Sequence, residues 1–291
     1  MLAGPGVIDA GAIAGLRAFA AAGNLGVANT WGAKGVFAWD SPHHLGTCGL
    51  QARDFELLGF ADADAVIATG VDDDESPTER FGLAPIEVVA PADLDRAAGE
   101  YMAAGEALPN ELYRRLAAVA QPGYVDEKVP LHPARAVADL GAVLAPGGLV
   151  TADPGVAGLW VARTFPTPPL APGDPRRVVV PSRRAAGFAT RLASDAARAG
   201  RTAIAVTTAP VDDATAVVLE QARRGDAGFV LVVWGAHGRL DTAEQHRQVI
   251  ADALAAPGPT VVEVPIALDD TALLVEAAGE VVAWGGLSSP P

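Results

Sequence analysis

Residues 31–54 read WGAKGVFAWDSPHHLGTCGLQARD, and the interpretation of the whole chain starts from this stretch. Four glycines and Pro42 interrupt its short apolar runs, so the sequence predicts a structured loop in place of a regular helix or strand. The loop directly follows a predicted strand at residues 27–30. In a doubly wound α/β sheet, a long irregular segment after a strand lies at the carboxyl edge, where ligands bind.

The residues before this loop predict a strand, a turn and a helix. The opening MLAGPGVI combines short apolar runs with Gly4 and Gly6, and the Ala-rich run 10–22 has the spacing of an amphipathic helix. The turn would aim backbone N–H groups and a helix dipole at one spot on the sheet edge. That spot suits a phosphate group.

The residues after the loop continue the alternation of predicted helices and strands. A helix is expected at 55–60, and strands are expected at 65–69 and 85–89. The acidic run 72–75 follows the first of these strands. It is either a solvated loop tip or a rim near a ribose, because carboxylates after a strand accept hydrogen bonds from ribose hydroxyls.

Three segments in this order carry a resemblance to a known family: TW-x-AKGVF, D-x-P-x-HLGT-x-GLQARDF and DADAVIATGVDDDESP. They resemble the middle domain of the thiamine diphosphate enzymes related to acetohydroxyacid synthase, pyruvate oxidase and benzoylformate decarboxylase. The resemblance covers residues 4–94. In that family the middle domain holds FAD, an adenine nucleotide or no ligand, so the resemblance implies a fold and leaves the ligand open.

Two α/β domains with mainly parallel, doubly wound sheets are expected. Residues 1–96 form the middle domain, 97–129 a connector punctuated by Pro109 and Asn110, and 130–291 a domain that resembles the family's diphosphate-binding domain. Strands in this last part read as continuous Val/Ile/Leu runs, as buried parallel strands do. The elements expected from the start of the connector helix to the end of the chain are helix 111–119, helix 133–144, strand 149–152, strand 178–180, helix 185–199, strand 203–206, helix 214–224, strand 229–234, helix 242–255, strand 260–264, helix 271–278 and strand 281–284.

The diphosphate-binding motif of the family is replaced in this domain. Family members hold Mg²⁺ and the diphosphate with Gly-Asp-Gly after one strand and Asn-Asn after the next, because Mg²⁺ requires oxygen ligands. Here Thr207-Thr208-Ala209-Pro210 and Trp234-Gly235 stand at these places. Thiamine diphosphate and Mg²⁺ are therefore not expected. Asp212 and Asp213 are expected to cap the next helix, the alternative being that they swing in as oxygen ligands.

Other landmarks of the second domain are kept or changed individually. Asp153, Gly155 and Trp160 correspond to the family's strand-end Asp, the Gly after it and the following Trp.

Arginines at 176, 177, 183 and 184 form a cationic island, which is either a solvated face or an anion or partner contact. The family's first domain, which activates the cofactor's pyrimidine ring, is expected to be absent or to be supplied by another chain.

Composition narrows the function classes. The 291-residue chain is 50% hydrophobic and carries a net charge of −14, so a nucleic-acid partner is not expected. No apolar run is long enough to span a bilayer, and the single cysteine, Cys48, suits a reducing compartment. A cytoplasmic protein without a membrane partner is expected. Cys48 is expected to be an inert buried thiol, and the scattered histidines predict no metal site.

A ligand site is predicted for the middle domain, with no catalytic residue assigned. Its residues are expected to converge at the carboxyl edge of the sheet: Gly4, Gly6, Thr30, Lys34, His44, Thr47 and Asp72. FAD or an adenine nucleotide are the possible cofactors. In the alternative, Trp31, Phe37 and Trp39 of the loop plug the crevice.

Three functions stay open. The chain is a catalytically degenerate relative, a pseudoenzyme acting as a binding or partner subunit; or a subunit of a split, acetolactate synthase-like carboligase or decarboxylase; or an enzyme of changed chemistry that uses a nucleotide or flavin. A homo-oligomer or a separate partner chain is expected, because the family buries large apolar surfaces between subunits.

Overall fold

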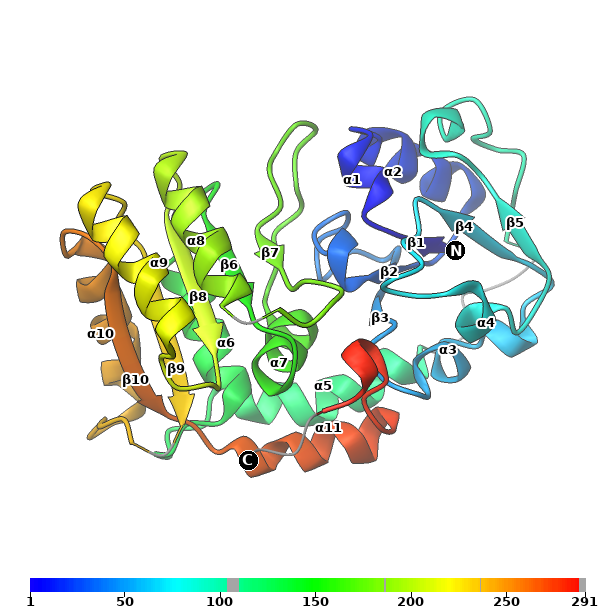
Figure 1. Cartoon of the computed structure of the whole chain (residues 1–291). Helices are drawn as coiled ribbons and strands as arrows, with labels where there is room; N and C mark the ends of the chain where they lie inside the picture. Colours follow the sequence, from blue (N-terminus) through cyan, green and yellow to red (C-terminus); the bar gives the residue numbers. More distant parts are fainter. Residues whose placement is uncertain (104–109, 186, 236, 288–291) are drawn as a thin grey trace. The chain divides into compact units, whose positions relative to one another are not determined.

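The computed structural model describes residues 1–103, 110–185, 187–235 and 237–287 (Figure 1). The chain divides into two compact units with one five-stranded sheet each. Unit 1 consists of Met1–Ala117, Thr167–Arg176 and Leu274–Gly286, and unit 2 consists mainly of Ala118–Pro166 and Arg177–Leu273. The domain boundaries predicted at residues 96 and 129 stay a prediction. Residues 104–109 of the predicted connector, Pro109 among them, lie outside the described residues.

The sheet of unit 1 is parallel and has the order β3-β2-β1-β4-β5. This order reverses direction between β1 and β4, which makes that point the topological switch point of the sheet. The strands are β1 (Leu2–Ala3), β2 (Val27–Thr30), β3 (His44–Cys48), β4 (Val66–Thr69) and β5 (Ile86–Val88).

Both faces of this sheet are covered by apolar packing. Neighbouring residues of a strand point to opposite faces, so Ala3 joins one core with Leu16 and Phe19, whereas Leu2 joins the other with Phe55 and Leu112. The helices of this unit are α1 (Gly6–Asp9), α2 (Ile13–Gly23), α3 (Asp54–Leu57), α4 (Thr78–Phe81) and the start of α5 (Glu111–Tyr124).

The sheet of unit 2 is also parallel, with the order β10-β9-β8-β6-β7. Its switch point lies between β6 and β8. The strands are β6 (Leu149–Ala152), β7 (Val178–Val179), β8 (Ala203–Thr207), β9 (Val230–Gly235) and β10 (Thr260–Pro265). Helix α6 packs against α7 and α10, and α8 lies beside α9 (Figure 1). The helices are α6 (Pro133–Val143), α7 (Val156–Thr164), α8 (Phe188–Arg198), α9 (Asp213–Arg224), α10 (Ala243–Ala255) and α11 (Thr271–Ala278), the last of which continues into unit 1.

The prediction of an α/β fold with two mainly parallel sheets is confirmed. Within it, two predicted segments are wrong. His44–Cys48, predicted as loop, forms the edge strand β3, and Gly46 has a φ of 115° inside it. Residues 281–284, predicted as a strand, form one bridge from Val281 to Gln51 and then a 3₁₀ turn at Ala283–Gly285. The extended backbone ends at Val282, which has helical dihedral angles (φ −113°, ψ −18°), and Trp284 follows with a φ of 57°.

Smaller differences concern helix ends. The helix predicted at 111–119 runs to Tyr124 and includes Pro122, so the proline does not end it as expected. The helix predicted at 10–22 begins after a break at Gly11, whose φ is 66°. The helix predicted at 185–199 begins at Phe188, and Ala186 lies outside the described residues. None of the helices in the described part of the chain combines the length and apolar character needed to cross a bilayer.

The backbones of Gly4 and Gly70 are in direct contact at the switch point of unit 1. A Cβ atom on Gly4 would overlap the carbonyl oxygen of Gly70 and the Cα of Val71, and one on Gly6 would lie 2.9 Å from the Cα of Gly70. Side chains are therefore excluded where β1 and β4 end.

Substituting Gly4→Ala is expected to destabilise unit 1 by at least about 3 kcal/mol, because the added methyl group meets backbone that cannot move alone. Urea unfolding, monitored by hydrogen exchange of the β1 and β4 amides, measures this loss of stability. Gly235→Ala is the matched control, since Gly235 ends a strand of unit 2 with open space around its Cβ position. Equal loss of stability in the two variants contradicts the prediction.

Candidate functional site

Polar side chains gather at the carboxyl edge of the sheet in unit 1. Thr30 and Thr69 end β2 and β4, and both are buried. Lys34, which follows the short 3₁₀ helix η1 (Trp31–Ala33), is only 8% exposed. Few lysines are buried to this extent without nearby polar partners, so this edge is the place to look for a site.

Lys34 takes part in a network that joins β2 and β3. Its Nζ donates to the Thr47 Oγ1 at 3.5 Å, and the Asn29 amide donates to the same oxygen at 3.4 Å. The Asn29 Oδ1 lies 3.0 Å from the His44 Nε2, and the His44 Nδ1 lies 3.3 Å from the Trp39 carbonyl oxygen. Three predicted residues, Lys34, His44 and Thr47, are thus brought together, and Asn29 is the member that sequence reasoning missed.

His44 is held in its neutral form. Burial and, to a smaller extent, the positive charge of Lys34 lower its pKa from the ordinary value of 6.5 to about 4, although the bond to the Trp39 carbonyl opposes the shift. A neutral imidazole next to a buried ammonium avoids two adjacent cations.

Glu75 is the second buried ionisable group at this edge, and the sequence analysis did not single it out. It belongs to the acidic run 72–75, but its side chain is turned inward and is only 5% exposed. The backbone N–H of Gly32 donates to its Oε2 at 3.1 Å. A Cβ atom on Gly32 would overlap the other carboxyl oxygen, so glycine is required for this contact.

Burial raises the pKa of Glu75 from 4.5 to about 7. The nearby Thr30 hydroxyl and the hydrogen bond from the Gly32 N–H act in the opposite direction, the charge of Asp72 adds to the rise, and Arg176 opposes it. Near neutral pH the carboxyl group is therefore divided between its protonated and ionised forms. Glu75 contacts Gly32 just after the end of β2, whereas His44 begins β3 opposite Val27, at the start of β2, so the structure does not place His44 at the predicted carboxyl edge.

Gly4 and Gly6 lie at the same edge, where their N–H groups bond to backbone. The Gly4 N–H donates to the Thr69 carbonyl at 2.9 Å and the Gly6 N–H to the Gly70 carbonyl at 2.9 Å. Asp72 lies in the loop after β4, where its Oδ1 accepts from the Asp74 N–H at 2.9 Å. The predicted ligand for these residues stays a prediction.

The aromatic side chains of the loop take two different positions. Trp31 and Phe37 are buried, and Trp31 packs on Trp284 with ring centroids 5.6 Å apart. Trp39 is 54% exposed, so its predicted place in a plug of the crevice is wrong. The chain turns toward solvent after Phe37, where Asp40 is also exposed. Cys48 is buried, as expected for an inert thiol.

The switch point of unit 2 is lined by residues that bond to one another. The Asp153 Oδ1 accepts the N–H of Ala189, in the first turn of α8, at 3.0 Å. Burial raises the pKa of Asp153, while the bonds from Ala189 and Thr207 oppose the shift and Asp212 adds to it. The Thr207 Oγ1 accepts the Ala209 N–H at 3.1 Å.

The expected capping role of Asp212 is confirmed. It is the N-cap of α9, and its Oδ1 accepts the Thr215 N–H at 2.8 Å. No group of three or more histidine, cysteine or carboxylate side chains that could hold a metal ion is found among the described residues.

Two arginines of the predicted cationic island have different partners. The Arg176 guanidinium pairs with Asp9 within unit 1. Arg177 belongs to unit 2 and donates to the Ala145 carbonyl at 3.4 Å.

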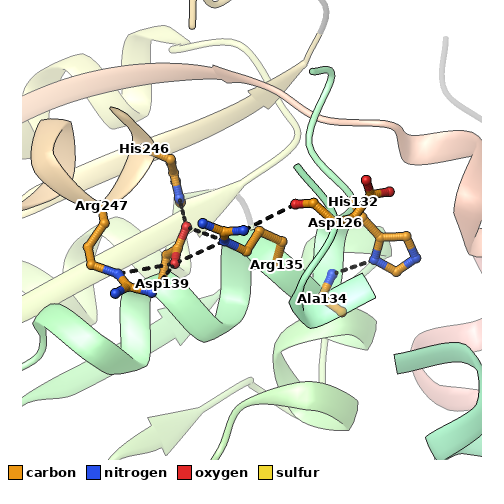
Figure 2. Close-up of polar contacts among 7 residues, drawn as sticks. All are labelled: Asp126, His132, Ala134, Arg135, Asp139, His246 and Arg247. Carbon is orange, nitrogen blue, oxygen red and sulfur yellow. Dashed lines mark hydrogen bonds and ion pairs between the residues drawn. The ribbon is translucent and has the colours of Figure 1, made fainter. Parts of the chain in front are cut away.

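A buried ion cluster joins α6 to α10 in unit 2 (Figure 2). The fully buried Asp139 carboxylate accepts from the Arg135 Nε at 3.2 Å and the Arg247 Nη2 at 2.9 Å, and lies 3.1 Å from the His246 Nδ1. Burial raises the pKa of Asp139, but the bonds from His246 and Arg247 prevail and leave it below its ordinary value. The cluster lies on the helices, away from the strand ends, and its role is to hold α6 and α10 together.

Comparison with known proteins identifies one part of the chain. Residues 1–98 match the family described as thiamine pyrophosphate enzyme, central domain. This match supports a thiamine pyrophosphate enzyme relative. It covers 98 of the 291 residues, and the strand order of unit 1 is the dinucleotide-binding order found in α/β proteins. No curated protein matches the chain.

The shifted groups predict two opposite dependences of stability on pH. The folded protein holds the Glu75 proton more tightly than the unfolded chain, so this group lowers stability as pH rises from 4.5 to about 7, by roughly 3 kcal/mol in total. The depressed pKa of His44 lowers stability as pH falls from 6.5 to about 4. Between pH 4.5 and 6.5 the two effects oppose each other.

Glu75→Gln is therefore expected to stabilise unit 1 above pH 7. The loss of stability that then remains is the one that His44 causes as pH falls. His44→Gln is expected to leave only the loss that Glu75 causes as pH rises. Protection factors of the β2 amides from hydrogen exchange, compared with the unmodified protein at each pH, measure both effects. Glu79→Gln, at an exposed position in α4, is the control. Parallel pH profiles for all three variants contradict this account.

Proposed function

We propose that the chain is a catalytically degenerate relative of the thiamine diphosphate enzymes that acts as a binding or partner subunit. The observation that carries the proposal is the set of side chains at the ends of β8 and β9, where the resembling family holds Mg²⁺ and the diphosphate. Beside them, the Asp153 carboxylate accepts the Ala189 N–H in the first turn of α8.

The neighbouring residues support the same proposal. Thr208 offers a hydroxyl where the resembling family has a carboxylate, and Asp212 is engaged as a helix cap. Trp234, at the end of β9, brings an indole where the family has an amide oxygen. These residues do not fit Mg²⁺ and a diphosphate, because Mg²⁺ requires several oxygen ligands in octahedral geometry.

A second candidate rests on unit 1. The buried Lys34 and the polar residues around it lie at the sheet edge where this fold binds nucleotides, which favours FAD or an adenine nucleotide as a ligand. With such a ligand the chain would be an enzyme of changed chemistry or a nucleotide-binding subunit. The burial of Trp31 and Phe37 supports the alternative of a plugged crevice.

One titration series separates these candidates. Calorimetry and thermal shift with thiamine diphosphate plus Mg²⁺ are expected to show no saturable binding at micromolar concentration. FAD, NAD, ADP and coenzyme A are tested in the same way. Thermal shift detects binding because a ligand that binds only the folded state raises the melting temperature. Binding of thiamine diphosphate overturns the degenerate role and favours a split acetolactate synthase-like enzyme. A shift with FAD or a nucleotide that is lost in Lys34→Gln favours the second candidate.

The partner role carries its own expectation. The chain is expected to form a homo-oligomer or to copurify with a second chain, as the resembling enzymes pair their domains across subunits. Light scattering of the purified protein at micromolar concentration measures its mass. A monomer without a copurifying chain contradicts the partner role and leaves the ligand-binding role to be tested by the titrations.

A further inference from the structure

A groove of about 500 Å³ runs between α8 and α9 in unit 2, away from the strand ends. This volume is within the range of pockets that hold small ligands. Helix α8 contributes Arg191, Ser194, Asp195 and Arg198, which follow one another at the spacing of a single helix face. The facing side of α9 contributes a short apolar wall that includes Val217 and Val218, and then Gln221.

The charges along the groove favour an anion. Arg191 has no ion pair or hydrogen bond with any side chain in the described part of the chain. Among the residues that the structure describes, the Arg198 side chain pairs only with Asp195, at 3.4 Å, and both side chains are largely exposed, so this pair is weak. Two guanidinium groups and one carboxylate give the groove a local charge of +1 in a chain whose net charge is −14.

The uncharged residues add two further features. Val217 is 55% exposed, so an apolar ligand group would remove its side chain from water. Ser194 is 1% exposed, and its hydroxyl has no hydrogen-bond partner among the described residues. A buried hydroxyl without a partner is unfavourable, and rotation of this side chain toward the groove would let it bond to an oxygen atom of a ligand.

We propose that this groove binds a small organic carboxylate with an apolar body. The carboxylate lies between Arg191 and Arg198 within reach of Ser194, and the apolar body lies along Val217 and Val218. Arginine suits this role because its planar fork donates two parallel bonds to a carboxylate. The site is independent of the function proposed for the strand ends.

The test uses the full chain, labelled with ¹⁵N, and three probes: octanoate, octylamine and inorganic phosphate. Octanoate is expected to shift the amide signals of the groove-facing residues of α8 and α9 with a Kd at or below the millimolar range, because one charged pair and a buried apolar chain supply about 4 kcal/mol. Octylamine, with the same chain and the opposite charge, is expected to leave them unchanged. Phosphate is expected to bind more weakly than octanoate.

Variants assign the contacts. Arg191→Gln is expected to weaken octanoate binding about tenfold, the usual effect of losing one charge-assisted bond. Ser194→Ala is expected to weaken it without lowering the melting temperature, since the hydroxyl has no bond to lose in the free protein. Arg224→Gln, in the last turn of α9 and paired with Glu220, is the control and is expected to bind normally.

Three outcomes overturn the proposal. The first is the absence of octanoate shifts up to about 10 mM, a concentration that detects even weak sites. The second is an equal response to octylamine or phosphate, which would remove the requirement for a carboxylate with an apolar body. The third is unchanged octanoate affinity in Arg191→Gln when compared with Arg224→Gln.

Discussion

The direct contact of the Gly4 and Gly70 backbones is the constraint on which unit 1 depends. β1 has only two residues, yet it is the central strand of the sheet and pairs with both β2 and β4. The bonds from the Gly4 and Gly6 N–H groups to the end of β4 continue this pairing beyond the strand. They fix the position of the loop that follows β4, and that loop carries Glu75 to the end of β2.

The polar edge of unit 1 is consistent with a site that keeps charge low. Near neutral pH, His44 is uncharged beside Lys34, and Glu75 is only partly ionised where it meets the Gly32 N–H. Ionised groups are expensive to bury, and shifts of this kind are the usual response. Such shifts also occur at functional sites. The same arrangement therefore suits both a ligand pocket and a former pocket that is now filled by side chains of the loop. The titrations distinguish these two states because only the first gains stability from a ligand.

The regular buried strands were predicted from the sequence better than the irregular segments and the inward-facing charged residue. Strands such as β8 (AIAVT) and β9 (VLVVWG) are almost entirely apolar, and their burial leaves little ambiguity. β3 was missed because Gly46 and Gly49 hide a short edge strand within a glycine-rich stretch. Glu75 was missed because an acidic run gives no sign of which carboxylate turns inward; that depends on Gly32, which is 43 residues away in sequence.

Unit 1 is not continuous in sequence, and this affects how the protein is made. Gln51 donates at 2.7 Å to the carbonyl groups of both Leu274 and Gly279, and Arg17 donates at 2.7 Å to the Leu170 carbonyl. A ribosome therefore releases the first sheet long before the segments that complete its packing. During that interval the nascent chain exposes the surfaces that Leu170 and Trp284 later cover.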